Sequence, residues 1–209
     1  MKTLVIGANG QIGQQLCALA AEDGLPIRAM LRRAEQAPWF SDRGIESVIA
    51  DLEGDFRQAA EGCTEILFTA GSGPGTGADK TLLIDLLGAI RAMDLADAMA
   101  MRRFIMVSAL RAEEPMQAPE ALRPYAAAKY AADRLLRLAR TPHLILKPGK
   151  LTNEAASGRL TTDPTSVSHI TVSRANVALA LREVLLRPEL NQAEFDLLDG
   201  NTPVEQLFS

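Results

Sequence analysis

The sequence predicts an α/β fold: a single doubly wound, mostly parallel sheet with helices on both faces. Short continuous apolar runs alternate along the chain with longer segments whose apolar residues recur at helical spacing. Strands that are apolar on both faces are typical of parallel sheets covered by helices on each side. The length fits one domain over residues 1–209, in which the polar stretch 151–170 and the C-terminal segment form a small substrate-side excursion.

Each expected element follows from a local pattern. Strands are expected where short apolar runs end in turn-forming or small residues, over 4–6, 27–31, 46–50, 65–70, 104–108, 143–147 and 194–198. The first helix is expected over 11–22, where Ile12, Leu16 and Leu19 share one face before Gly24 ends it. Longer helices are expected over 79–99, 125–139 and 173–188, and Ser173 is a favourable N-cap for the last of them.

Composition excludes several classes of function. Apolar residues make up 47% and charged residues 23%, as in soluble globular proteins, and no apolar run reaches the length of a membrane span. The net charge is −4 without a long basic block, so neither nucleic acid nor a membrane is an expected partner. Cys17 and Cys63 are expected to be buried thiols, and no cluster has metal-ligand spacing, so no metal is expected. A strand begins almost at the first residue, which favours a cytoplasmic protein without a signal peptide.

Three glycines separate the first strand from the first helix. Gly7, Gly10 and Gly13 are suited to a tight turn, a close approach of the backbone to a pyrophosphate, and close packing of helix on strand. The helix N-terminus then offers free N–H groups to the phosphates. The loop residues expected to bind a dinucleotide are Gly7, Asn9, Gly10, Gln11, Ile12 and Gly13. The alternative is an ordinary strand-to-helix turn.

Two arginines follow the second strand, where an acidic residue would bind the ribose hydroxyls of NAD. Arg32 and Arg33 suit a 2′-phosphate by charge and by the fork geometry of the guanidinium group. The sequence therefore predicts NADP(H) in preference to NAD(H). The alternative is a solvated pair at the end of a strand.

A tyrosine and a lysine four residues apart open an alanine-rich helix. This spacing puts Tyr125 and Lys129 on one helical face, where the ammonium group would lower the pKa of the phenol toward the range useful for proton transfer. Ser108 ends the fifth strand, at the carboxyl edge where such sheets bind ligands, and would polarise the same substrate oxygen. The alternative is a surface tyrosine over a solvated lysine.

These motifs resemble the atypical and extended short-chain dehydrogenase/reductase superfamily, in particular its small NmrA-like, flavin-reductase-like branch. The resemblance extends over essentially the whole chain and implies a Rossmann-type fold. Its specific parts are the loop 5–13 and the Tyr125/Lys129 pair, with support from 147–149 and 170–178.

The resemblance also implies further cofactor contacts. Lys129 would bond the nicotinamide ribose, and Asp51 and Leu52 would lie beside the adenine. The remaining contacts would come from residues after the fourth and sixth strands: Ala70, Gly71, Ser72, Pro148 and Gly149.

The predicted function is an NADPH-dependent oxidoreductase that transfers a hydride to a small carbonyl, quinone or flavin-like acceptor. Tyr125, Lys129 and Ser108 would be its catalytic residues, and its partner a small-molecule substrate, with the chain a monomer or homodimer. The alternative is a non-catalytic NAD(P)-binding redox-sensing regulator of the NmrA-like type. A nucleotide-sugar epimerase is less expected, because such relatives are much longer. The sequence leaves open whether the glycine-rich loop 71–77 is a flap. It also leaves open the roles of four side chains: Lys80, Asp85, Lys147 and Arg174.

Overall fold

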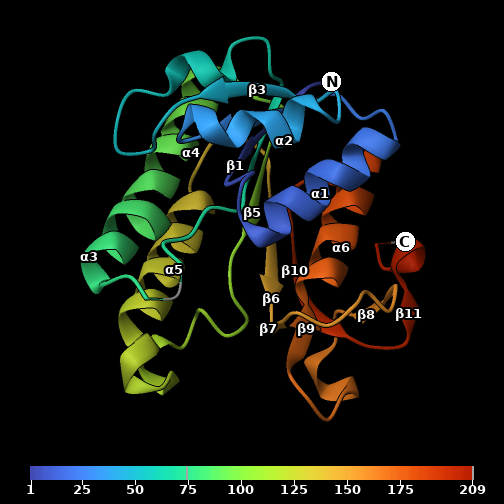
Figure 1. The fold of residues 1–209 in the computed structure, drawn as a ribbon. Helices are drawn as coiled ribbons and strands as arrows, with labels where there is room; N and C mark the ends of the chain where they lie inside the picture. Colours follow the sequence, from blue (N-terminus) through green and yellow to red (C-terminus); the bar gives the residue numbers. More distant parts are fainter. Residues whose placement is uncertain (74, 209) are drawn as a thin grey trace.

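A nine-stranded sheet forms the centre of the protein, in a computed structural model that describes residues 1–73 and 75–208 (Figure 1). Its strand order is β11-β8-β10-β6-β5-β4-β1-β2-β3. The strands that pair in parallel are β1 (Thr3–Ile6), β2 (Ile27–Leu31), β3 (Glu46–Ile49), β4 (Glu65–Phe68), β5 (Arg103–Val107), β6 (His143–Pro148) and β10 (Ala193–Asp199). The chain order reverses between β1 and β4, which is where open α/β sheets bind ligands, outside the carboxyl ends of the strands. The predicted fold class is confirmed.

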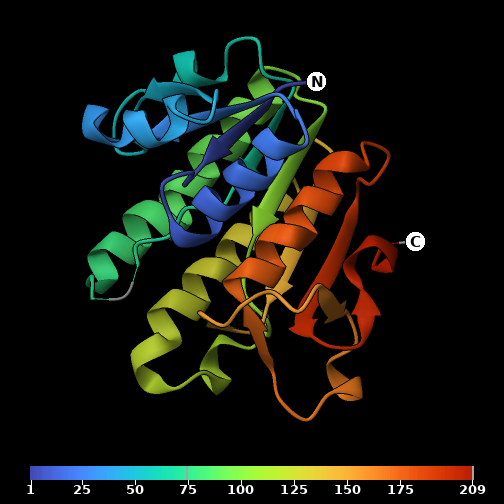
Figure 2. The ribbon, with the colours of Figure 1, turned by 45° about the vertical axis from the view of Figure 1, so that its right-hand side comes forward.

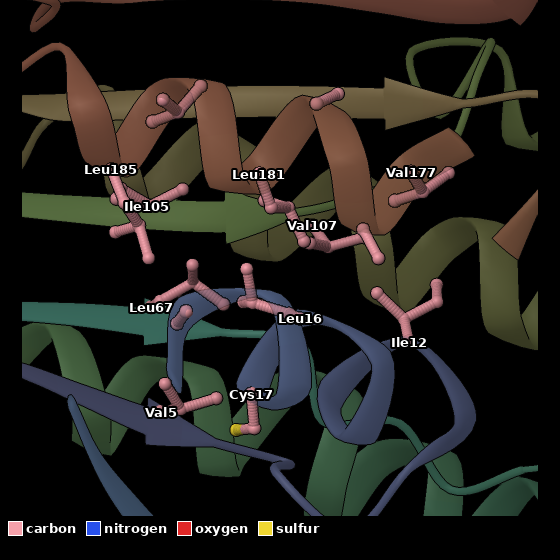
Figure 3. Close-up of a cluster of buried hydrophobic side chains, with 14 of the residues drawn as sticks. Val5, Ile12, Leu16, Cys17, Leu67, Ile105, Val107, Val177, Leu181 and Leu185 are labelled. Carbon is pink, nitrogen blue, oxygen red and sulfur yellow. The ribbon is translucent and has the colours of Figure 1, made fainter. Parts of the chain in front are cut away.

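Side chains alternate between two cores, one on each face of the sheet. Val5 of β1 joins the core under α1 (Gln11–Glu22) and α6 (Arg174–Leu186), whereas Leu4 and Ile6 join the core on the opposite face. Figure 3 shows the first core, in which Leu16 of α1 and Leu181 of α6 meet above the strands. Since both faces are buried, the central strands contain continuous apolar runs, as the sequence indicated.

The helices divide between the two faces. Figure 2 shows α1 beside α6 on one face, whereas α4 (Ala89–Ala98) and α5 (Arg123–Leu136) lie on the other. A short helix, α2 (Ala37–Ser41), which the sequence analysis did not anticipate, follows β2. None of the helices in the described part of the chain combines the length and apolar character needed to cross a membrane.

The long helix expected over 79–99 is divided into three parts. It begins as α3 (Ala78–Lys80), continues as a π-helical segment over Thr81–Gly88, and returns to α-helical geometry in α4. A π-helical turn changes which residues face inward, and such turns occur frequently at functional sites.

The polar region expected to be an excursion contains strands of its own. β7 (Lys150–Thr152) and β9 (Thr171–Ser173) pair in parallel as a separate two-stranded sheet. β8 (Arg159–Thr161) pairs antiparallel with β10 and with β11 (Thr202–Pro203) at the edge of the main sheet. Asn176 of α6 ties this region down, because its amide donates to Ser157 Oγ at 2.9 Å and to Asp199 Oδ1 at 2.6 Å.

Candidate active site

A cleft of about 950 Å³ opens at the carboxyl ends of β4, β5 and β6. The segments that follow these strands form its base, and the start of α5 and the π-helical segment form one wall. The residues predicted from sequence that line it are Ile12, Ala70, Gly71, Ser72, Ser108, Tyr125, Lys129, Pro148 and Gly149. The sheet thus brings together candidates from five separate segments of the chain.

Lys129 is held at the bottom of the cleft. Only 3% of the residue is exposed, and its Nζ donates a hydrogen bond to the carbonyl oxygen of Val107 at 3.1 Å. The same Nζ lies 3.6 Å from Asp85 Oδ1 and 5.8 Å from the centre of the Tyr125 ring. Lys129 is therefore a fixed, buried cation beside a half-buried phenol, rather than a solvated surface lysine.

Asp85 was left open by the sequence, and the π-helical segment turns it into the cleft. It is 1% exposed, and its Oδ2 accepts a hydrogen bond from the Ser72 backbone N–H at 2.9 Å. Its Oδ1 has no hydrogen-bond partner in the described part of the chain, although Lys129 neutralises its charge. The carboxylate thereby joins the loop after β4 to the lysine of α5.

Ser108 is buried at the end of β5, and its hydroxyl is already engaged. Its Oγ donates to Asp133 Oδ2 at 2.5 Å. Burial raises the pKa of Asp133 to about 6, against the lowering effects of the Ser108 hydrogen bond and of the Lys129 charge. Asp133 follows Lys129 by four residues and Tyr125 by eight, so the spacing that identified the first pair could also have identified this carboxylate.

The three glycines of the first loop have different surroundings. Gly7 has φ +90°, and a Cβ there would lie 2.5 Å from the backbone nitrogen of Ala70. A Cβ on Gly13 would lie 2.3 Å from the carbonyl oxygen of Gly7. On Gly10, the N-cap of α1, it would meet only that same oxygen, at 3.2 Å. Gly7 and Gly13 are therefore required because a side chain there would clash with neighbouring backbone atoms. Gly10, in contrast, faces open space where a ligand could approach the backbone.

The remaining residues of the loop lie at the helix N-terminus. Asn9 and Gln11 are exposed, and the Gln14 amide donates to Asn9 Oδ1 at 3.1 Å. Ile12 is almost buried and links the core to the cleft. No acidic residue occupies the first turn of α1, so nothing there competes with an anionic ligand for the helix N-terminus.

The two arginines after β2 are exposed beside this loop. The backbone N–H groups of Arg32 and Arg33 both donate to Gln36 Oε1 at 3.1 Å, and within the described residues neither guanidinium has a bonded partner. Lys80 pairs with Glu53 at 2.7 Å. The Glu53 carboxylate raises the pKa of Lys80 and Arg32 opposes it, so Arg32 lies within electrostatic reach of Lys80.

The turn after β3 is organised by its own side chains. Asp51 Oδ1 accepts from the Glu53 N–H at 2.9 Å, and Leu52 is buried against Gly88. Arg91 donates to the Leu52 carbonyl oxygen. Asp51 remains partly exposed at the same edge of the sheet as the glycine loop.

The other side chains left open by the sequence have structural partners. Lys147 points away from the cleft to Glu113 and to Glu194, the latter at 2.7 Å; although burial opposes it, these carboxylates raise the pKa of Lys147. Arg174 lines the cleft, where its guanidinium donates to the Thr152 carbonyl oxygen at 3.2 Å and to Asn153 Oδ1 at 2.7 Å.

The loop after β4 and the turn after β6 also border the cleft. Gly71, Ser72, Gly73, Gly75 and Thr76 line it, while Pro74 of the loop 71–77 lies outside the described residues. A Cβ on Gly149 would lie 2.4 Å from the Ile170 carbonyl oxygen, so the turn packs tightly on the residue that precedes β9. Among residues 1–73 and 75–208 there is no group of three potential metal ligands.

Comparisons with known proteins agree with this geometry. Residues 7–188 match the model of a family described as NAD(P)H-binding. The chain is 42% identical over 210 residues to YhfK of Bacillus subtilis, an uncharacterized sugar epimerase, with 99% of this chain and 98% of that protein covered.

Two solved structures are similar over nearly the full chain. A Bacillus halodurans protein with a provisional assignment as an NAD-dependent epimerase/dehydratase is 37% identical, with a TM-score of 0.93 over 99% of this chain and 97% of that one. The oxidoreductase ylbE of Lactococcus lactis is 25% identical, with a TM-score of 0.87 over 99% of this chain and 94% of that one.

Proposed function

The chain belongs to the NAD(P)H-binding family of Rossmann-fold oxidoreductases within the atypical short-chain dehydrogenase/reductase superfamily, and on that premise we propose that it is an NADPH-dependent reductase. Its acceptor is a small molecule with a carbonyl, quinone or flavin-like centre. The observation that carries the proposal is the buried ammonium group of Lys129, fixed 5.8 Å from the Tyr125 ring at the bottom of the cleft. A buried cation beside a half-buried phenol has a chemical use in proton transfer that a ligand-binding surface does not need.

The residues around the glycine loop fit a dinucleotide. Gly10 leaves open space beside its backbone, and the first N–H groups of α1 lack intrahelical acceptors, so the loop suits a pyrophosphate. Asp51 and Leu52 would flank the adenine, and the segment from Ala70 to Ser72 would cover the adenosine half.

Cofactor preference is proposed from Arg32 and Arg33. Both guanidinium groups are free of bonded partners in the described part of the chain, so they can bind a 2′-phosphate without first breaking an ion pair. A charge-assisted contact contributes about 1.5–3 kcal/mol, so NADPH should bind roughly tenfold to a hundredfold more tightly than NADH. Fluorescence titration with each cofactor measures this. Equal dissociation constants, or an Arg32→Ala/Arg33→Ala variant that retains the preference, would contradict the assignment.

A bound nicotinamide supplies the hydride, and the side chains of this protein supply the proton and the positioning. Tyr125 donates its phenolic proton to the acceptor oxygen as charge develops there. Lys129 stabilises the resulting phenolate and, in its position near the cleft floor, would also bond the nicotinamide ribose. The Ser108 hydroxyl donates a hydrogen bond to Asp133, so its oxygen is available to accept a hydrogen bond from the phenol or from the product hydroxyl.

Substitution of the tyrosine tests this proposal. Tyr125→Phe should lower kcat by about 10²–10⁴-fold with NADPH affinity nearly unchanged, because general acid catalysis acts in the transition state. Tyr130→Phe, on the same helix, is the matched control and should retain wild-type activity. NADPH oxidation is followed spectrophotometrically with a panel of carbonyl, quinone and flavin acceptors.

The outcomes separate the competing functions. Full activity in Tyr125→Phe would remove the phenol from the mechanism. Cofactor binding without turnover of any acceptor would favour the redox-sensing regulator instead. Sugar isomerisation without net consumption of the cofactor would favour the epimerase activity for which the Bacillus subtilis relative is named.

A further inference from the structure

The cleft is positively charged, although the protein as a whole is acidic. The chain has 26 acidic and 22 basic residues, yet the charged side chains that line the cleft are Arg111, Lys129, Lys150 and Arg174 against one carboxylate, Asp85. Asp85 is already neutralised by Lys129. The three cations that remain lie on the side of β5, β6 and α6, across the cleft from Arg32 and Arg33.

None of these three cations has an acidic partner within the described chain, and the side chains of two of them have no hydrogen-bond partner there either. Arg111 follows β5 and Lys150 opens β7, and both are exposed. Their segments are joined, because the Leu110 N–H donates to the Pro148 carbonyl oxygen at 2.9 Å. Arg174, in contrast, already binds Thr152 and Asn153. Arg111 and Lys150 are therefore the free pair at the mouth of the cleft.

The acidic residue two positions after Arg111 is engaged by other cations. Glu113, two residues further on, binds Lys147 and Arg137 and so does not neutralise Arg111. Arg111 also has φ +60°, a left-handed conformation that is uncommon outside glycine. The guanidinium group of Arg111 thus has no ion-pair partner in the described chain, and its backbone has a conformation that residues other than glycine rarely adopt.

Beside these cations the wall of the cleft is apolar. Leu110 and Leu151 are half-buried, whereas Leu122 is 53% and Ile170 41% exposed. Large exposed apolar side chains that line a concave site provide a surface for an apolar ligand. The mouth therefore presents an apolar wall and a free pair of positive charges together.

Resting on the reductase function proposed above, we infer that the acceptor is an amphipathic acid, whose carboxylate binds Arg111 and Lys150 and whose apolar body lies on Leu122, Leu151 and Ile170. The cofactor phosphates do not satisfy this pair, because the glycine loop and Arg32 and Arg33 serve them elsewhere. Binding of the carboxylate at the rim leaves the reducible centre of the same molecule free to extend toward Tyr125.

Calorimetric titration of the NADP⁺-saturated protein tests this with octanoate, octanamide and acetate. Octanoate should bind at least tenfold more tightly than octanamide, which has the same chain without the charge. Acetate, which has the charge without the chain, should bind far more weakly than either. The variants Arg111→Gln and Lys150→Gln should each weaken octanoate binding about tenfold and leave octanamide binding unchanged.

Two further variants complete the test. Ile170→Asn should weaken octanoate and octanamide alike, because it alters only the apolar wall. Arg134→Gln, an exposed arginine of α5 outside the cleft lining, is the control and should bind octanoate as the wild type does.

A prior NADPH titration separates this inference from the function on which it rests. If NADPH binds but octanoate and octanamide bind equally, or not at all, the inference is wrong and the proposed reductase stands. If Arg111→Gln and Lys150→Gln weaken NADPH binding instead, these residues serve the cofactor and the inference is again wrong. If NADPH fails to bind, the same titrations are made on the protein without cofactor. A preference for octanoate there would mean that the reductase proposal fails and that the pair remains an acid-binding site.

Discussion

Asp133 connects the chemistry of the site to the stability of the protein. Its side chain is buried at the carboxyl end of β5, where it accepts the Ser108 hydrogen bond at 2.5 Å. Burial raises its pKa to about 6 from an ordinary value of 3.8. The folded protein therefore holds this proton more tightly than the unfolded chain does between about pH 4 and pH 6.

The sign and size of the effect follow from linkage. Where the folded state binds more protons than the unfolded chain, the free energy of unfolding falls as the pH rises. The stability that comes from holding the proton on Asp133 is therefore fully present below pH 4 and is lost by about pH 6. At about 1.4 kcal/mol per pKa unit, ionisation of Asp133 costs about 3 kcal/mol at neutral pH. Asp133→Asn cannot ionise and avoids this cost. Its free energy of unfolding, relative to that of the wild type, should therefore increase by about 3 kcal/mol between pH 4 and pH 7.

Urea unfolding of both proteins at a series of pH values measures this difference, and other titrating groups cancel in it. Asp94→Asn, at an exposed position on α4, is the control for loss of one surface carboxylate. A difference between wild type and Asp133→Asn that stays constant from pH 4 to pH 7 would show that Asp133 ionises as an ordinary aspartate does.

Two further predictions concern the glycine loop and the buried ion pair. Gly10→Val should abolish NADPH binding with little change in Tm, whereas Gly13→Val should itself lower Tm, because a Cβ there lies 2.3 Å from a backbone oxygen. A Gly13→Val protein with wild-type Tm would contradict this packing. Asp85→Asn should lower the free energy of unfolding by about 3 kcal/mol, because Lys129 stays buried without its counter-charge, and Lys129→Met added to it should restore most of that loss in urea unfolding. An Asp85→Asn protein as stable as the wild type would show that the ion pair contributes nothing.

The main sheet could be predicted because its signal is local and strong. Strands such as 104–108 and 143–147 contain the uninterrupted apolar runs 104–107 and 144–146, and burial on both faces explains that pattern. β7, β8 and β9 were missed, because they are three residues long and polar, so neither their periodicity nor their composition differs from that of a loop. Their pairing depends on contacts with β10, β11 and each other, which are distant in sequence.

Asp85 shows why one part of the site was not predicted. On a regular helix over 79–99, a solvated position was the more probable place for this side chain. The π-helical segment Thr81–Gly88 changes which residues of the helix face inward and turns Asp85 toward Lys129. No sequence pattern in this segment predicts that change. Lys147 could have been placed from the alternation of β6, because its neighbours Leu144 and Leu146 both join the core under α1 and α6.

Helix α5 explains how the candidate residues reach the same point. Tyr125, Lys129 and Asp133 follow one another at four-residue spacing, so one face of the helix presents a phenol, an ammonium group and a carboxylate to the ends of the strands. Ala128 and Ala132 are almost completely buried, and their small side chains allow the helix to lie close enough for Lys129 to reach the Val107 carbonyl and for Asp133 to reach Ser108. A larger residue at either alanine would lengthen both bonds at once. The geometry of the proposed site therefore depends on these two alanines as much as on the three polar side chains of the same helix.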